Sequence, residues 1–254
     1  MSVAIAWESR GDGPPLLLIH GLGYARWGWE PVADRLAERF RVLLFDNRGI
    51  GGSDVPPGPY TAGAMAGDAA QVLDEAGVEC AHVVGTSLGG MVAQELALAR
   101  PDRIDRLVLA CTTPGGDGAF PLPQRTLELI AEAPSLAPEV ALRRFVENAL
   151  ADDAPAELVD RIYAHRLEHP PDPAGWAAQA AAGASFDAWD RVGGIAAPTL
   201  VLHGTADGVV DPRNAALLAE RIPEARVRLF EGRGHLFFWE DPDGFVAVVE
   251  EFLA

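Results

Sequence analysis

A serine between two glycines is the residue that most clearly predicts chemistry in this chain. Segment 85–89 reads GTSLG and lies between the apolar run 81–86 and the helical pattern 91–101. Larger side chains would collide where a strand turns sharply into a helix, so glycine suits both flanking positions. Such a turn exposes the hydroxyl of Ser87 above a helix N-terminus, where free N–H groups favour negative charge. The pattern therefore predicts a serine nucleophile.

A serine nucleophile needs a base, which an acidic side chain must orient. His235 lies in a glycine-rich loop after the last strand pattern, which makes it the predicted base. Asp207 follows the strand pattern 198–204, so its carboxylate is expected at the carboxyl end of a strand, where such sheets build their sites. The sequence thus predicts a catalytic triad of Ser87, His235 and Asp207.

Other acidic and histidine residues fit structural roles better. Asp211, the rival of Asp207, precedes Pro212 and suits a helix N-cap. Asp117 lies far beyond the strand pattern that precedes it. His82 and His203 lie within strand patterns, so we expect them to pack in the core or at strand ends. His165 and His169 lie in the helical segment 113–192, and we expect them to be solvated.

Short apolar runs alternate with helical patterns along most of the chain. Continuous apolar runs of this kind fit strands that are buried on both faces of a parallel sheet. They occupy 15–20, 41–46, 81–86, 106–111, 198–204 and 225–230. The run 3–8 predicts an added antiparallel strand at the edge. The alternation predicts an α/β doubly wound sheet with right-handed crossovers.

Residues 113–192 interrupt this alternation. The segment has no strand pattern, and its prolines separate short amphipathic helical patterns. We interpret it as a helical lid (cap) whose apolar residues roof a pocket. The α/β core would then comprise residues 1–112 and 193–254.

Composition and charge exclude several classes of protein. The chain has 254 residues, which suits one domain with an insertion, and a formal net charge of −17, which disfavours a nucleic-acid partner. No apolar run approaches the roughly 18 residues that span a membrane. The N-terminus lacks the basic and apolar regions of a signal peptide, so we expect a cytoplasmic protein with no membrane partner. A monomer and a homodimer both remain open.

The two cysteines and the histidine spacing give no sign of a bound metal. Cys80 and Cys111 lie in or beside apolar segments, and buried free thiols are expected there. No Cys/His spacing is typical of a zinc site. The sequence predicts neither a metal nor a cofactor.

Five segments resemble the α/β-hydrolase family, specifically its small lidded esterase and lactonase branch with proteins similar to 3-oxoadipate enol-lactonase. The resemblance covers nearly the whole chain and rests on HGLG (20–23), DNRGIGGSD (46–54), GTSLGG (85–90), PTLVLHGTAD (198–207) and GRGH (232–235). The order Ser, Asp, His is also that of the family. The resemblance implies an eight-stranded, mostly parallel sheet with the lid after the sixth strand. It also implies an oxyanion hole formed by the backbone N–H groups of Leu22 and Leu88.

The predicted function is hydrolysis of a carboxylic ester or lactone, a small-molecule substrate, through an acyl-enzyme. Ser87 separates the chain from the dehalogenase and epoxide-hydrolase branches, which carry aspartate at that position. A cofactor-free perhydrolase or haloperoxidase and a carbon–carbon bond hydrolase use the same triad and stay open. A ligand receptor on this fold, which would not catalyse, is the alternative from another class.

Several further residues could shape the substrate pocket. Trp27, Trp29 and Phe237 follow the oxyanion loop or the histidine loop and are candidates for lining an apolar pocket, although core or surface packing should explain most of these rings. A substrate with a free carboxylate would need an arginine in the pocket, for which Arg143, Arg144 and Arg166 are candidates. Asp46 and Arg48 are expected to pair and fix the loop beside the site.

Overall fold

Seven strands form one sheet within residues 3–254, which are the residues that the computed structural model describes. Their order is β1-β3-β2-β4-β5-β6-β7, and all neighbours run parallel except β1 and β3. The bounds are Trp7–Arg10 (β1), Pro15–Ile19 (β2), Arg41–Phe45 (β3), Ala81–Thr86 (β4), Ile104–Ala110 (β5), Thr199–Gly204 (β6) and Arg226–Phe230 (β7).

The predicted fold class is confirmed, and the described sheet has one strand fewer than the resemblance implies. The antiparallel edge strand begins at Trp7 and not at residue 3. Ala4 and Ala6 instead each make two hydrogen bonds to the loop after β3, and because both N–H groups donate to side chains, these bonds do not form a ladder. With seven strands, the inserted helices follow β5 and not a sixth strand.

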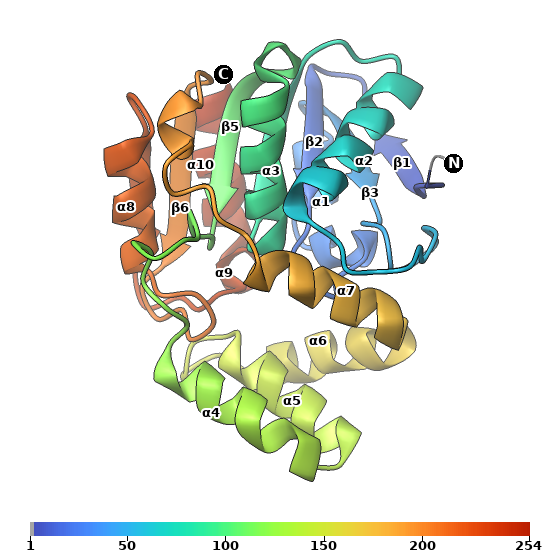
Figure 1. Cartoon of the computed structure of the whole chain (residues 1–254), viewed down its shortest axis with the longest axis vertical. Helices are drawn as coiled ribbons and strands as arrows, with labels where there is room; N and C mark the ends of the chain where they lie inside the picture. Colours follow the sequence, from blue (N-terminus) through green and yellow to red (C-terminus); the bar gives the residue numbers. More distant parts are fainter. Residues whose placement is uncertain (1–2) are drawn as a thin grey trace.

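Helices cover both faces of the sheet because the central strands alternate two sets of apolar side chains. Leu17 and Ile19 of β2 pack in one buried cluster, with residues of α2, α3 and α8. Leu16 and Leu18 pack in the other, with residues of α1, α9 and α10. Figure 1 shows these two helical layers, whose bounds are Ala33–Leu36 (α1), Ala62–Glu75 (α2), Leu88–Ala99 (α3), Arg213–Arg221 (α8), Phe237–Glu240 (α9) and Pro242–Leu253 (α10).

Four helices lie between β5 and β6, within the predicted lid 113–192, which we call the inserted segment. They are α4 (Gln124–Glu132), α5 (Pro138–Asn148), α6 (Ala156–Glu168) and α7 (Pro173–Ala184). In its described backbone the segment has no strand and a single isolated β-bridge, between Gly115 and Asp187. Figure 1 places these helices beyond the end of the sheet where β4 turns into α3.

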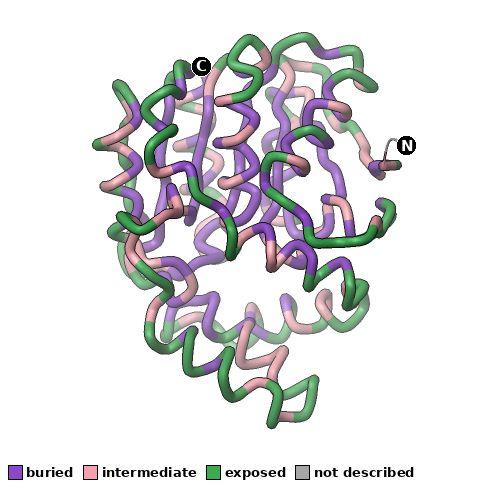
Figure 2. The backbone as a smooth tube through the Cα atoms, in the orientation of Figure 1, coloured by how far each residue is buried: buried purple, intermediate pink, exposed green. Residues whose placement is uncertain are grey.

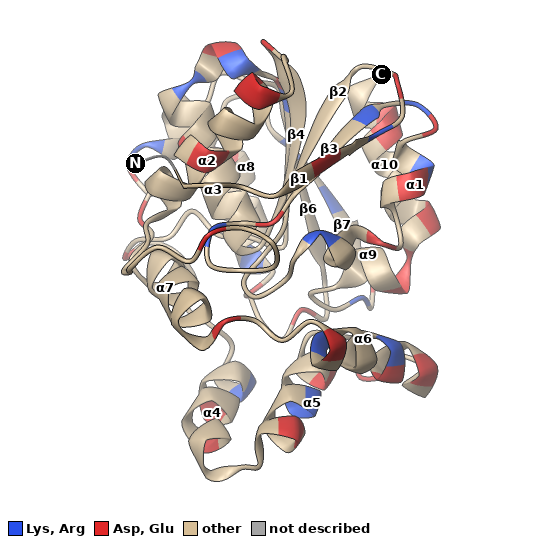
Figure 3. Cartoon of the chain, turned by 90° about the vertical axis from the view of Figure 1, so that its right-hand side faces the viewer, with Lys and Arg blue, Asp and Glu red and all other residues tan. Residues whose placement is uncertain are grey.

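Burial and charge differ between the sheet and the inserted segment. Strands β2 to β6 form a buried centre, whereas the edge strand β7 and helix α4 are largely exposed and α5 is a mixture of exposed and partly buried residues (Figure 2). Acidic and basic residues are mixed on α5 and α6 (Figure 3), where Arg143 pairs with both Glu147 and Asp160. Within the described residues, no helix combines the length and the apolar character that crossing a bilayer requires.

Both cysteines are free thiols, as predicted, but only one of them is buried. Cys111 lies at the end of β5 and is buried, and burial is the main cause that raises the pKa of its thiol. Cys80 precedes β4 and is exposed, which corrects the expectation of two buried thiols. Strand β4 begins one residue after Cys80, so the apolar pattern of the sequence wrongly predicted a buried position for Cys80.

Candidate active site

Ser87 occupies the turn between β4 and α3 in a strained backbone conformation. Its φ is +54° and its ψ is −121°, a region that residues with a β-carbon rarely adopt. A β-carbon at Gly85 would collide with the backbone of Gly89, and one at Gly89 would collide with the backbone of Ile19. The two glycines of the GTSLG motif are therefore required by the close approach of β2, β4 and α3.

His235 and Asp207 are brought together from two loops at the same edge of the sheet. Nδ1 of His235 lies 2.7 Å from Oδ2 of Asp207, and both residues are buried. The other carboxylate oxygen accepts hydrogen bonds from the backbone N–H groups of Val209 (2.7 Å) and Val210 (2.9 Å). The carboxylate is thus fixed in position and holds the Nδ1–H tautomer of His235, which leaves Nε2 as the basic atom.

A second histidine, His203 of β6, also contacts the acid. Its Nε2 lies 2.9 Å from the same Oδ2 of Asp207. Burial by itself would raise the pKa of Asp207, but the charge of His235 and the hydrogen bonds from both histidines outweigh burial and hold that pKa below its ordinary value. Sequence reasoning assigned His203 to packing, and it is fully buried, but its contact with Asp207 was missed. The sequence signal for this contact was the position of His203, one residue before the end of the strand that precedes Asp207.

The rival acids lie elsewhere. Asp211 accepts hydrogen bonds from the backbone N–H and the guanidinium of Arg213, at the start of α8. The expected N-cap role of Asp211 is wrong by one residue, because α8 begins at Arg213 and its N-cap is Pro212, which makes no side-chain cap hydrogen bond. Asp117 is exposed in the loop after β5. The acid in contact with His235 is Asp207.

The loop after β2 lies against Ser87 and presents a free N–H group. A β-carbon at Gly21 would lie 2.9 Å from that of Ser87, so this loop contacts the turn directly. Within the described chain, neither Leu22 nor Leu88 uses its backbone N–H in a hydrogen bond, whereas Gly21 and Gly23 do. Two unpaired donors beside Ser87 are what an oxyanion hole requires.

A family model described as alpha/beta hydrolase fold matches residues 14–242 of this chain. The chain belongs to this family. A curated relative from Azorhizobium caulinodans, "Putative carbamate hydrolase RutD", is 34% identical to this chain. The aligned region covers 94% of this chain and 91% of the relative's chain. The pimeloyl-[acyl-carrier protein] methyl ester esterase of Aeromonas hydrophila is 30% identical over 100% of both chains.

A solved structure shows the same arrangement of elements. The enol-lactonase from Burkholderia xenovorans LB400 superposes on this chain with a TM-score of 0.85 and is 26% identical to it. The superposition covers 99% of this chain and 96% of the enol-lactonase chain. The resemblance stated from the sequence is therefore confirmed at the level of the family.

His20, at the start of the oxyanion loop, is held neutral in this hydrolase. Burial, helped by the positive charges of His235 and Arg166, lowers its pKa to about 3. Nδ1 of His20 accepts a hydrogen bond of 2.7 Å from the N–H of Gly21. A β-carbon at Gly28 would lie 2.5 Å from His20 Nε2, so the ring has little freedom to move. His20 therefore fixes the shape of the loop that contains Leu22.

Helix α7 of the inserted segment also fixes this loop. Gln179, which is fully buried, accepts a hydrogen bond of 3.1 Å from Gly23 N–H through Oε1 and donates one of 2.8 Å to the carbonyl of Arg48. One amide thus joins two loops of the core to the insertion. Nothing in the spacing of the sequence singles out a lone glutamine for this role.

The three aromatic candidates occupy different positions in the hydrolase. Trp29 and Phe237 are fully buried, and both pack against Phe238 in the core. Trp27 is partly exposed and lines a surface hollow of about 770 Å³, whose lining contains none of the three proposed catalytic residues. A role of these rings in a substrate pocket stays a prediction.

The three candidate arginines have different partners. Arg143 pairs with acids of α5 and α6, and Arg144 pairs with Glu132. The guanidinium of Arg166 lies over the ring of Tyr24 and donates a hydrogen bond of 3.1 Å to the carbonyl of Gly23. Arg166 is therefore the arginine that contacts the oxyanion loop.

The expected pair of Asp46 and Arg48 is wrong. Asp46 instead accepts hydrogen bonds from the backbone and side chain of Arg26, and Arg48 makes a two-point ion pair with Asp68 of α2 at 2.5 and 2.6 Å. Asp46 and Arg48 are two residues apart and their side chains point to different partners. Asp46 therefore fixes the loop against the segment of Arg26, and Arg48 fixes it against α2.

Proposed function

We propose that the chain is a serine hydrolase that cleaves a carboxylic ester or lactone through an acyl-enzyme. The observation that carries the proposal is the buried 2.7 Å hydrogen bond between His235 and Asp207, at the sheet edge where Ser87 occupies its strained turn. A histidine held in this tautomer by a carboxylate is the base that a serine nucleophile requires.

The first half of the reaction forms the acyl-enzyme. His235 Nε2 removes the proton of the Ser87 hydroxyl as the oxygen attacks the carbonyl carbon of the substrate. The positive charge that forms on the ring lies against Asp207, whose lowered pKa keeps it ionised. His235 then gives the proton to the leaving alkoxide.

The negative charge of the tetrahedral intermediate would fall on the oxyanion loop. The N–H groups of Leu22 and Leu88 are the donors proposed to bind it, and each such donor is worth about 2.7–4 kcal/mol of transition-state stabilisation. The loop that contains Leu22 is held by Gln179 and His20, so the N–H group of Leu22 needs no rearrangement as the charge forms. In the second half of the reaction, His235 activates a water molecule that attacks the acyl group and releases Ser87.

The inserted segment is proposed to roof this site. Arg166 of α6 and Gln179 of α7 both contact Gly23, next to Leu22, from the side opposite the sheet. A guanidinium at this position would favour an acyl group that carries a carboxylate. We therefore propose that dicarboxylate half-esters or lactone acids are better substrates than neutral esters of equal length.

The experiment is a panel of p-nitrophenyl esters of increasing acyl length, simple lactones, their carboxylate-bearing analogues, a carbamate and a carbon–carbon hydrolase substrate. Turnover of esters or lactones, absent in Ser87→Ala, supports the proposal. Selective turnover of the carbamate or the carbon–carbon substrate would replace it with another hydrolase activity, as would peroxide-dependent halogenation. Release of one slow equivalent of p-nitrophenol without turnover would indicate a receptor.

A further inference from the structure

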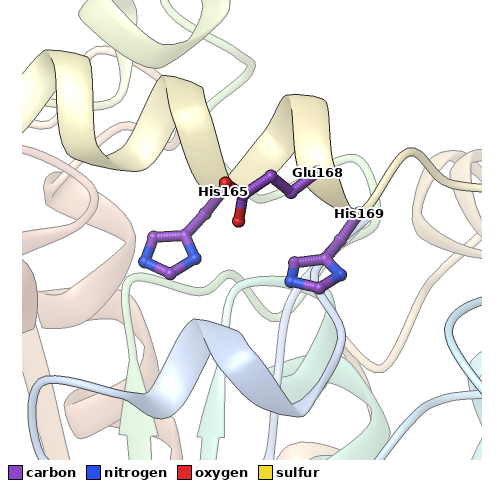
Figure 4. A group of neighbouring side chains, drawn as sticks. All are labelled: His165, Glu168 and His169. Atoms are coloured by element: carbon purple, nitrogen blue, oxygen red, sulfur yellow. The ribbon is translucent and has the colours of Figure 1, made fainter.

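The last turn of α6 carries three side chains that commonly bind metal ions. His165, Glu168 and His169 each offer one ligand atom, and these atoms all lie within 4.8 Å of one another. Figure 4 shows the three side chains on the same side of the helix, with both rings directed toward the turn beneath. We propose that this group, called the α6 cluster, binds one divalent transition-metal ion of the Zn²⁺ type through two imidazole nitrogens and one carboxylate oxygen.

The spacing of the α6 cluster suits a single ion. Residues three and four apart lie on one face of a helix, and two histidines four apart are the pattern of helical zinc sites. Zinc bonds to nitrogen and oxygen are about 2.0–2.2 Å long, so tetrahedral ligand atoms lie about 3.3–3.5 Å apart. Closing the cluster from 4.8 Å requires small side-chain rotations, which Glu168 and His169 are free to make because they are exposed.

The two nitrogens of His165 have different surroundings. Nε2 lies 2.7 Å from Oε2 of Glu30, and Glu30 in turn pairs with Arg161 at 2.7 Å. Nδ1 is buried and has no hydrogen-bond partner in the described part of the chain. A carboxylate that binds one ring nitrogen and leaves the other free for the ion is the usual second partner of a metal-binding histidine. The contact with Glu30 therefore leaves Nδ1 of His165 available for the ion.

The surroundings of the α6 cluster also favour a cation. Trp27 stacks on both rings, with centroids 5.2 Å from His165 and 6.0 Å from His169, and holds the two rings on the same side. The cluster lies at the carboxyl end of α6, where the helix dipole favours positive charge. Glu168 and His169 line the surface hollow of about 770 Å³ next to Trp27, which gives an ion access from solvent.

A bound ion would also stabilise the contact between α6 and the oxyanion loop. Arg166, which donates to the carbonyl of Gly23, lies in the same helical turn as the three ligands. The metal site itself does not depend on the proposed hydrolase activity, and its test is independent of it.

The test is a calorimetric titration of the full-length chain, without a histidine tag and stripped with a chelator, with ZnCl₂. We expect saturable binding of one zinc ion per chain. His165→Ala and His169→Ala should each weaken binding by at least about tenfold, and Glu30→Gln by about tenfold through loss of the second partner. Glu157→Gln, on the same helix, and Cys80→Ser, an exposed thiol, are matched controls that should bind like the parent chain.

A second measurement keeps the proposal open to refutation if a variant folds poorly. The electron paramagnetic resonance spectrum of the parent chain with one equivalent of Cu²⁺ should show coupling to two imidazole nitrogens. Either absence of saturable zinc binding in the parent chain or unchanged affinity in the folded His165→Ala, His169→Ala double variant would overturn the proposal. Circular dichroism of each variant establishes that it is folded.

Discussion

Two histidine–carboxylate pairs in this chain have the same N···O distance and different surroundings. His235 with Asp207 and His165 with Glu30 are each joined at 2.7 Å. The side chains of the first pair are 9% and 0% exposed, whereas those of the second are 25% and 44% exposed. The difference teaches that a close histidine–carboxylate contact leaves the other ring nitrogen available in either place, and that burial and the surroundings of that nitrogen decide what it can be used for.

The neighbours of the two pairs make this contrast specific. Asp207 accepts four hydrogen bonds, two from the backbone and two from histidines, so its carboxylate has no freedom to rotate. Glu30 is divided between His165 and Arg161 on the surface. We infer that the buried pair serves proton transfer, which needs fixed geometry, and that the exposed pair serves ion binding, which needs access.

The largest expected effect comes from removing the nucleophile that distinguishes the buried pair. Ser87→Ala should lower kcat for ester hydrolysis by about 10⁴-fold to 10⁶-fold, because the base then has no hydroxyl to activate. The melting temperature should stay close to that of the parent chain. Steady-state kinetics with p-nitrophenyl butyrate test this, and activity within tenfold of the parent would refute Ser87 as nucleophile.

The second prediction sets the two carboxylates against each other. Asp207→Asn should lower kcat by about 10⁴-fold, because an amide favours the wrong tautomer of His235. The matched change Glu30→Gln, measured in metal-free buffer, should leave kcat within a factor of about two. Equal losses in the two variants would show that the buried pair has no special role.

The third prediction concerns His203, the additional partner of Asp207. His203→Ala should lower kcat by about tenfold and also lower stability, because a buried carboxylate loses a hydrogen bond worth about 1.5–3 kcal/mol. His203→Gln, whose amide N–H can take the place of Nε2–H, should recover most of kcat. If the glutamine variant recovers stability but not kcat, His203 does more than position Asp207.

The fourth prediction concerns stability and not catalysis, through its dependence on pH. The pKa of His20 is about 3 in the folded chain, well below the ordinary value, so the unfolded chain binds one more proton between about pH 6.5 and 3. The free energy of unfolding should therefore fall with acidification in this window, by up to about 1.4 kcal/mol per pH unit from His20. Asp207, whose folded pKa is lowered, adds a further loss only below about pH 4.

The measurement for this last prediction is denaturant unfolding between pH 7 and 4, compared with His20→Gln. The glutamine variant should show a shallower decline. The exposed pair of His165 and Glu30 supplies the contrast, since Glu30→Gln should leave the slope of the parent chain almost unchanged. Identical slopes in the His20→Gln variant and the parent chain would contradict the burial of a neutral His20.

Much of the fold followed from local patterns in the sequence. Five apolar runs correspond to β2 through β6 because strands buried on both faces leave few polar positions to obscure them. The sixth run corresponds to β7, for which burial on both faces was a wrong expectation, since only Phe230 of this edge strand is buried. The antiparallel edge strand was misplaced by four residues, since one exposed face makes its pattern resemble a loop. An eighth strand was expected from resemblance alone, and no run of residues supported it.

The candidate site was predictable where the chemistry is written as a motif. GTSLG specifies its own strained turn, because only glycine avoids the collisions at positions 85 and 89. Asp207 and His235 were found by their places at the ends of strands, where parallel sheets collect loops at one edge. Contacts between distant polar side chains, such as the Arg26 pair of Asp46, were not predictable, because many partners of the right charge exist.

The sequence by itself indicated where the strands lie along the chain, the turn at Ser87 and the candidate acid and base, since backbone sterics and burial act on neighbouring residues. Only the tertiary structure decided that His203 shares Asp207, that Gln179 holds the oxyanion loop and that Glu30 binds one side of the α6 cluster. Each of these depends on side chains brought together by packing, for which sequence spacing carries no signal.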